Sequence, residues 1–287
     1  MFIDLKNVSF TYNLSMPFET EVLKSINLSI NKGDFIGIIG HTGCGKTTLL
    51  QIFNGLLEPT EGKITIDGID INKEKDKLKE IRKNIGLTFQ YPENQLFEET
   101  IFKEISFGPK NLGIKDDELE ERVKKAMEMV EMDYTTYKDR SPFTLSGGEM
   151  RRVAIASILS IDPEVIILDE PTASLDPLNK KSLLKLISKL HLHYRKTIIL
   201  VSHNMEVIAE LAQRIIVMDR GKIVLDNNPK QIFQNYVEEL ESIGLSLPQI
   251  TYIMHRLKKI GKPVDSGILS LEEAKNEILR VTKKIQR

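Results

Sequence analysis

Residues 40–47 read Gly-His-Thr-Gly-Cys-Gly-Lys-Thr, which is the spacing of a phosphate-binding loop. Glycines let backbone N–H groups wrap around phosphates, and a helix that begins near Lys46 would direct its positive end at them. Lys46 is expected to reach the β- and γ-phosphates, and the Thr47 hydroxyl to ligate Mg²⁺. A buried strand is predicted before the loop and a helix over 48–54 after it. The residues expected to bind the nucleotide here are Gly40, His41, Thr42, Gly43, Cys44, Gly45, Lys46, Thr47 and Thr48.

Two adjacent carboxylates follow an apolar run at 165–168. The run predicts a buried strand, so Asp169 and Glu170 would stand at its end. Asp169 is expected to hold Mg²⁺, directly or through water, as the acidic partner of the phosphate-binding loop. Glu170 could polarise the attacking water as a general base. The two motifs together predict hydrolysis of a nucleoside triphosphate.

A third motif, Leu-Ser-Gly-Gly-Glu at 145–149, is predicted to precede a helix over 149–159. Free N–H groups at a helix N-terminus bind anions, so this motif predicts a second anion-binding surface away from the phosphate-binding loop. The three motifs together indicate an ATP site that is completed only when two such chains meet.

Strands and helices must bring these motifs together. Continuous apolar runs predict strands covered on both faces, and helical patterns separate them, which is typical of an α/β fold with a mostly parallel sheet. Partly alternating runs near the N-terminus predict further β-structure. The expected strands are 2–8, 22–30, 35–39, 64–68, 165–168, 197–201 and a hairpin of 215–218 with 222–225, and the expected helices include 48–54, 116–132, 149–159 and 178–190.

Length and composition narrow the class of protein. The 287 residues suffice for one large domain plus an appendage or for two small domains, and 41% hydrophobic residues provide a core. The net charge is −1, and basic and acidic residues are interspersed along the chain, so the sequence does not indicate a basic surface that would bind nucleic acid. The single cysteine fits a reducing compartment. No apolar run approaches the roughly 18–20 residues that span a bilayer, and the start lacks a signal-peptide pattern. We therefore expect a cytoplasmic protein that meets a membrane only through a partner.

The C-terminal part predicts short amphipathic helices over 229–242, over 248–260 and after Ser270. Ser270 and Glu273 have the spacing of a capping box for the last of them. These helices follow a core that is already complete. They could pack on their own domain or dock on a partner, and the sequence leaves both open.

This set of motifs is similar to that of the ATP-binding-cassette (ABC) ATPase family over about residues 2–245. The resemblance implies an α/β P-loop NTPase of ABC type, with a mostly parallel core sheet, an antiparallel β subdomain and a helical subdomain at about 91–160. Residues 246–287 would form a C-terminal helical extension that serves dimerisation. The implied cofactors are ATP and Mg²⁺.

The resemblance also assigns roles around the chain's own nucleotide. Tyr12 would stack on adenine. Gln90 would join the Mg²⁺ and water shell and sense the membrane partner. His203, just after the predicted strand 197–201, would be the switch histidine that contacts the γ-phosphate.

Other implied roles concern the opposing subunit. Ser146, Gly147 and Gly148 would contact the γ-phosphate that the opposing subunit holds. Asp176, in Ser-Leu-Asp at 174–176, would couple the two sites.

Three segments resemble a narrower group, the ATPases of energy-coupling-factor transporters for vitamins and metal ions: 91–97, 107–113 and the tail around 243–248. His-Thr-Gly at 41–43 and an insertion at 16–19 resemble the second of the paired ATPase subunits. The implied partners are a related ATPase (a heterodimer rather than a homodimer), a transmembrane scaffold that docks on 90–107, and an integral membrane substrate-binding protein. The chain would then be peripheral, at the cytoplasmic face of the cell membrane.

Departures from the family pattern are small. Cys44 stands where serine is more usual in this loop. Its main-chain N–H can still bind phosphate, but the thiol brings some risk of oxidation. Glu149 stands where glutamine is commoner. Two alternatives remain: the ATPase of a conventional ABC importer and a non-transport ABC ATPase. DNA-repair members of the second class insert long coiled coils between these motifs, but only about 55 residues separate Gln90 from the third motif here. The sequence lacks the guanine-selecting Asn-Lys-x-Asp element that a GTP-binding switch would have. A pure binding module would not need an intact Lys46 and Glu170.

Overall fold

The computed structural model describes residues 1–91 and 95–285. Its core is a six-stranded sheet in the order β10-β9-β3-β8-β7-β6. The five strands from β9 to β6 are parallel, and β10 runs antiparallel to β9 as the predicted hairpin. The strands are β3 (Phe35–Ile39), β6 (Ile85–Thr88), β7 (Val165–Asp169), β8 (Thr197–Val201), β9 (Arg214–Asp219) and β10 (Lys222–Asn227).

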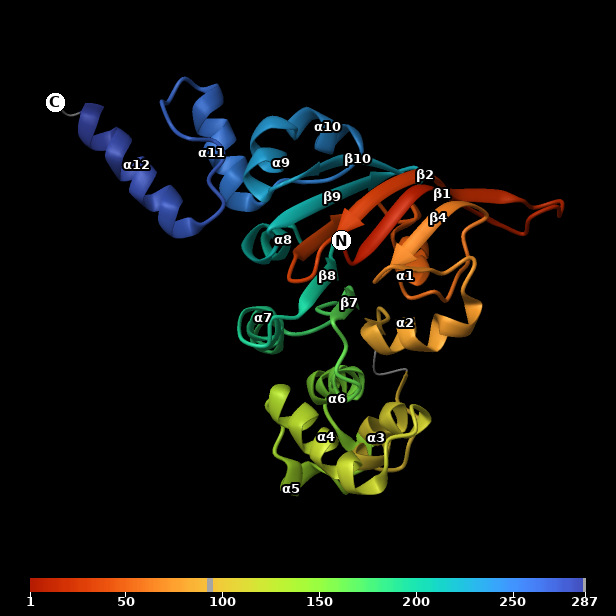
Figure 1. Ribbon diagram of the computed structural model, residues 1–287. Coiled ribbons are helices and arrows are strands. Elements are labelled where there is room, and N and C mark those ends of the chain that lie inside the picture. Colours follow the sequence, from red (N-terminus) through yellow and green to blue (C-terminus); the bar gives the residue numbers. More distant parts are fainter. Residues whose placement is uncertain (92–94, 286–287) are drawn as a thin grey trace.

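A second, antiparallel sheet packs over one face of the core sheet, in the order β2-β1-β4-β5 (Figure 1). Apolar side chains of β1 and β2 share one buried cluster with alternate residues of β3 and with α1 (Lys46–Phe53). This layer is the predicted antiparallel subdomain. Its strands are β1 (Ile3–Tyr12), β2 (Thr20–Ile30), β4 (Glu61–Ile66) and β5 (Ile69–Asp70), and it is followed by η1 (Lys75–Lys77) and α2 (Leu78–Asn84).

Helices cover the opposite face of the core sheet and share a second buried cluster with it. Beyond this layer, α3, α4 and α5 form a helical subdomain at one end of the molecule (Figure 1). The helix predicted over 116–132 ends earlier, because Glu131 takes a left-handed conformation (φ 59°) that stops it. The helices are α3 (Ile101–Asn111), α4 (Asp116–Met129), α5 (Tyr134–Tyr137), η3 (Pro142–Thr144), α6 (Gly147–Leu159), α7 (Pro177–Leu192) and α8 (Met205–Leu211).

The C-terminal helices lie at the end of the molecule opposite the helical subdomain (Figure 1). The single helix predicted over 229–242 is two helices, because the non-helical backbone of Tyr236 (φ −118°, ψ 36°) interrupts it. The last two helices have a small core of their own, which includes Met254, Val264 and Val281. The elements are α9 (Pro229–Asn235), α10 (Val237–Ser242), α11 (Gln249–Lys259) and α12 (Leu271–Ile285).

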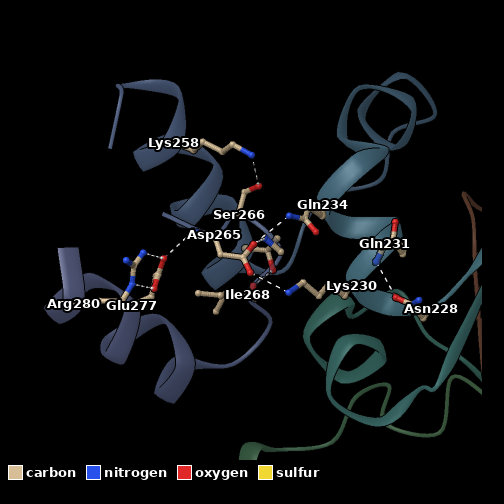
Figure 2. Close-up of polar contacts among 12 residues, drawn as sticks. Asn228, Lys230, Gln231, Gln234, Lys258, Asp265, Ser266, Ile268, Glu277 and Arg280 are labelled. Atoms are coloured by element: carbon tan, nitrogen blue, oxygen red, sulfur yellow. Dashed lines mark hydrogen bonds and ion pairs between the residues drawn. The ribbon is translucent and has the colours of Figure 1, made fainter. Parts of the chain in front are cut away.

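Polar contacts join these last helices to the rest of the chain (Figure 2). Asp265 accepts hydrogen bonds from Lys230 Nζ (2.9 Å) and Gln234 Nε2 (3.1 Å), both on α9. The Asp265 N–H in turn donates to Glu277 of α12 (3.0 Å). The extension therefore packs on its own chain, and this contact leaves other faces of α11 and α12 exposed. Among the described residues, no helix is both long and apolar enough to cross a membrane.

Candidate active site

The predicted catalytic residues follow four neighbouring parallel strands. The phosphate-binding loop follows β3, His203 follows β8, the carboxylates Asp169 and Glu170 close β7, and Gln90 follows β6. These strands are adjacent in the order β3-β8-β7-β6, and parallel strands end at the same edge of a sheet. Open α/β sheets bind ligands at this carboxyl edge. Six segments far apart in the chain, including β1 and β2, thereby line one cavity of about 340 Å³.

Glycines are required at two positions of the loop. A Cβ on Gly40 would lie 2.3 Å from the Met218 carbonyl oxygen, and one on Gly45 would lie 2.9 Å from Leu23 Cδ2. Gly45 also has a left-handed φ of 105°, which L-residues rarely adopt. This conformation starts α1 (Lys46–Phe53) two residues before the predicted 48–54, so the lysine lies in its first turn. The N–H groups of this first turn have no partner within the helix, and they lie in the phosphate-binding loop itself.

Lys46 is the buried cation of the site. Its Nζ donates to the carbonyl oxygens of Gly40 (2.7 Å) and His41 (2.9 Å). An ammonium has three donors, so it can exchange one of these carbonyls for a phosphate oxygen with little movement. The loop therefore holds the charge in place before any anion arrives.

Thr47 and Asp169 form the oxygen pair predicted to hold Mg²⁺. The Thr47 hydroxyl donates to Asp169 Oδ2 at 3.1 Å, and burial raises the pKa of this carboxyl. Gln90 lines the same cavity. No three His, Cys, Asp or Glu side chains of the described residues could hold a metal ion by themselves. A hydroxyl and a carboxylate oxygen suit Mg²⁺, which is usually held by one or two carboxylates together with substrate phosphates.

Glu170 has the environment of a general base. Its side chain is buried and its backbone is left-handed (φ 49°). Burial, and after it the adjacent Asp169 charge, raise its pKa to about 7. Within the described residues, Glu170 Oε1 has no hydrogen-bond partner, and His203 Nε2 lies 3.5 Å away. A buried carboxylate with a free lone pair and a pKa near neutrality can take a proton from water.

His203 is half exposed beside that carboxylate. Burial, and then the Lys46 charge, lower its pKa, so the imidazole is mainly neutral at pH 7. A neutral ring can donate one hydrogen bond and accept another. It thus stands at the mouth of the cavity as a hydrogen-bonding group.

Tyr12 borders the same cavity on the β1 side. Its hydroxyl lies 3.3 Å from Thr48 Oγ1, and the Phe10 ring meets it edge to face at 4.7 Å. These two contacts hold the ring in place, and 38% of the residue stays exposed. Val22 and Val201, which sequence reasoning did not single out, also line the cavity. Val201 ends β8 two residues before His203, which is the signal that could have found it, whereas Val22 comes close to Gly45 only in the fold.

Two predicted loop residues have side chains outside the cavity. His41 turns to Asp219 (Nε2 to Oδ1, 3.0 Å) and to the Thr42 carbonyl oxygen (2.8 Å). Cys44 is 1% exposed, and burial raises the pKa of its thiol. Burial and a raised pKa both lower the reactivity of a thiol, so the structure argues against the expected risk of oxidation. Both residues can bind phosphate only through their backbone.

The Leu-Ser-Gly-Gly-Glu motif forms a helix N-terminus, but α6 starts at Gly147 rather than at 149. Ser146 is the N-cap, and Glu149 completes a capping box. Glu149 Oε2 accepts hydrogen bonds from the Ser146 N–H (2.9 Å) and hydroxyl (2.7 Å), while Oε1 accepts from the Tyr137 hydroxyl (2.9 Å). The bonds from Ser146 lower the pKa of Glu149. Glutamate thus serves here as a structural carboxylate.

Asp176 lies next to this motif. It caps α7 by accepting from the N–H groups of Leu178 (2.9 Å) and Asn179 (3.1 Å), and Asn179 Nδ2 donates to its other oxygen (2.5 Å). A Cβ on Gly148 would lie 3.0 Å from the same Asn179 side chain, whereas one on Gly147 would meet open space. Ser146, Gly147, Gly148 and Asp176 are not among the residues that line the nucleotide cavity.

Comparisons with known proteins agree with this geometry. The profile of the family described as "ABC transporter" matches residues 23–173. The chain is 52% identical to the energy-coupling factor transporter ATP-binding protein EcfA2 of Clostridium tetani, covering 98% of this chain and 97% of that protein. It is 55% identical to the protein of the same name in Caldanaerobacter subterraneus subsp. tengcongensis, covering 97% and 96%.

Solved structures show the same fold. The cbiO1 protein of Clostridium perfringens, described as part of the ABC transporter complex cbiONQ, is 34% identical with a TM-score of 0.74, covering 88% of this chain and 98% of that one. A dimeric cassette, MJ0796, bound to ADP and Pi, is 32% identical with a TM-score of 0.70, covering 79% and 98%. The predicted P-loop fold of ABC type is confirmed. The chain belongs to the ABC transporter family and is one of its ATP-binding cassettes.

Proposed function

We propose that this chain is the ATP-hydrolysing subunit of an energy-coupling-factor transporter, which powers uptake of vitamins or metal ions through a shared transmembrane scaffold. One observation carries the need for a partner cassette: the anion-binding motif at Ser146 does not line the chain's own nucleotide cavity. The names of relatives that match nearly the whole chain support the class of transporter.

The chain's own residues would act on ATP from several sides. Tyr12 stacks on the adenine, and Lys46 with the loop N–H groups holds the phosphates. Mg²⁺, when bound by Thr47, Asp169 and Gln90, would neutralise phosphate charge. Glu170 accepts the proton of the attacking water.

His203 completes this arrangement as a contact to the γ-phosphate. Its Nε2 lies 3.5 Å from Glu170 Oε1, and this proximity supports a role for both groups at one reacting centre. The low pKa of the ring keeps it free to donate a hydrogen bond without carrying a charge of its own.

A sister cassette supplies the other half of each site. In the closed dimer, the N-terminus of α6 with Ser146, Gly147 and Gly148 contacts the γ-phosphate held by the sister. Asp176 links this surface to the loop after Glu170. ATP would favour the closed dimer because these contacts exist only there.

The membrane partner would dock beside α3. Phe97 and Phe107 meet edge to face at 4.9 Å and are 57% and 42% exposed, and Tyr91 is also exposed. Exposed aromatic clusters are typical of interaction sites. Residues 92–94 of the segment predicted to contact the scaffold lie outside the described residues.

The division into a cassette (2–245) and an extension (246–287) remains part of the proposal, as does dimerisation through the extension. Tyr252 and Ile253 on α11 are each 47% exposed, and Ile260 is 70% exposed, so an apolar surface is available. We place the chain at the cytoplasmic face of the membrane, bound to the scaffold.

Reconstitution tests this function. The chain, a related cassette, the scaffold and a small integral substrate-binding protein would be co-expressed and placed in vesicles with ATP enclosed in the lumen and the solute outside. ATP-dependent uptake of a vitamin or metal ion that is lost in Lys46→Ala is the expected result. Co-purification with a soluble binding protein in place of the integral one would instead favour a conventional importer.

A further inference from the structure

Arg151 lies on α6 five residues after Ser146, and its side chain is 2% exposed. Its Nη1 donates to the carbonyl oxygens of Pro171 (2.6 Å) and Ala173 (2.8 Å). Both carbonyls belong to the loop that directly follows Glu170. One guanidinium therefore joins the helix of the Ser146 motif to the loop of the general base.

That loop has an unusual backbone. Glu170 (φ 49°) and Ser174 (φ 62°) are both left-handed although neither is glycine. Conformations of this kind persist only where surrounding contacts hold them, and they cluster at functional sites. Within the loop, the Ala173 N–H donates to the Glu170 carbonyl (3.1 Å), and the Glu170 N–H donates to the Val201 carbonyl (3.0 Å). The carbonyls of Pro171 and Ala173 are held by Arg151.

We propose that Arg151 is a positioning residue that couples the chain's two half-sites. It sets the orientation of the loop that carries Glu170, which acts on this chain's ATP. It also ties that loop to the N-terminus of α6, which faces the sister's ATP. This second part rests on the proposed function, because it requires the Ser146 motif to contact the sister's nucleotide.

A guanidinium suits this task better than other donors. Its fork of N–H groups is rigid and always charged, so it can hold two carbonyls in a set geometry inside the protein. A lysine could satisfy the carbonyls with a point charge but would hold their relative position less tightly. An apolar side chain of similar length would leave both buried carbonyls without this donor.

The neighbouring Arg152 provides a matched control. It lies on the same helix, but its Nη2 donates to Ser182 Oγ of α7 (2.7 Å) and its Nη1 to the Val130 carbonyl. Its hydrogen bonds therefore anchor α6 to α4 and α7. Removing it perturbs the same helix with no direct effect on the Glu170 loop.

The experiment uses the full chain assembled with its sister cassette and scaffold, in two forms that each retain one working site. In one form the sister's general base is disabled, so that turnover reports Glu170. In the other, Glu170→Gln leaves only the sister's nucleotide, which the Ser146 motif contacts. We expect Arg151→Met to lower kcat at least about tenfold in both forms, with the KM for ATP within about twofold. Arg151→Lys recovers part of the loss, and Arg152→Met stays within about threefold of wild type.

Hydrogen exchange gives an independent readout on the isolated full chain. Residues 170–176 should exchange faster in Arg151→Met than in wild type or Arg152→Met. Equal loss of kcat in both arginine variants, or unchanged exchange of this segment, would overturn the proposal. A loss confined to this chain's own site would overturn the coupling, provided that Ser146→Arg abolishes turnover at the sister's nucleotide. If Ser146→Arg has no effect there, the proposed sandwich itself fails, and the coupling fails with it.

Discussion

Glu170 is a buried carboxylate whose ionisation the folded state opposes. Its pKa is about 7 in the folded chain against an ordinary value of 4.5. For an acid with a raised pKa, the folded state binds more protons than the unfolded state between these two values. The chain therefore loses stability as the pH rises from about 4.5 to 7, and the loss is complete above that range.

The size of this loss follows from the two pKa values. At pH 8 it amounts to about 3 kcal/mol, and at pH 5, where the folded carboxyl is still protonated, it falls below about 1 kcal/mol. Glu170→Gln has the same shape without the ionisable group. We therefore expect the variant to gain about 2–3 kcal/mol in unfolding free energy at pH 8 and little at pH 5.

Urea unfolding of the chain in EDTA, without nucleotide, measures this gain at both pH values. Glu149→Gln is a control of opposite sign, because hydrogen bonds from Ser146 lower the pKa of Glu149, and its carboxylate stabilises the chain above its ordinary pKa. The Glu170→Gln variant should at the same time lose about 10²–10⁴-fold in kcat at its own site. A variant no more stable than wild type at pH 8 would refute the burial argument. Near-normal turnover in a complex whose sister site is disabled would refute the general-base role.

Three further predictions concern single side chains. Ser146→Arg should block turnover at the sister's nucleotide. The chain's own ATP affinity, measured by titration with a fluorescent nucleotide, should stay within about twofold of wild type, because Ser146 does not line the cavity. Weaker ATP binding by the variant would count against this separation of the two sites. Tyr12→Ala should weaken ATP binding about fivefold through lost stacking, and Tyr12→Phe should not; equal effects would assign the role to the hydroxyl. Native Cys44 should react with Ellman's reagent at least about 100-fold more slowly than in urea, because burial raises its pKa. Rapid labelling of the native chain would show that the loop opens.

Much of the site could be predicted from the sequence because its determinants are local. Lys46 and Thr47 have a set spacing from the loop glycines, and the acidic pair directly follows an apolar run. Ser146 and Glu149 cap a helix three residues apart. In each case the chemistry depends on residues within one turn or one strand end, where spacing along the chain determines geometry.

Other features depend on contacts between distant segments. Arg151 reads as one more polar residue of α6, and only the structure shows its two carbonyl partners beyond Glu170. The position of Asn179 between Gly148 and Asp176 is equally invisible in the sequence. The break of the helix at Tyr236 and the early start of α6 were also missed, because element ends depend on packing and capping more than on periodicity.

By itself, then, the sequence determined the kinds of candidate catalytic group and the strand or helix end that each occupies. The tertiary structure alone decided which of those ends meet. The sheet order β3-β8-β7-β6 is not the order of the chain, and it gathers Lys46, His203, Glu170 and Gln90 at one edge. The same fold keeps Ser146 out of that cavity. Strand pairing is a non-local interaction selected by burial of whole faces, so no spacing along the chain encodes it directly.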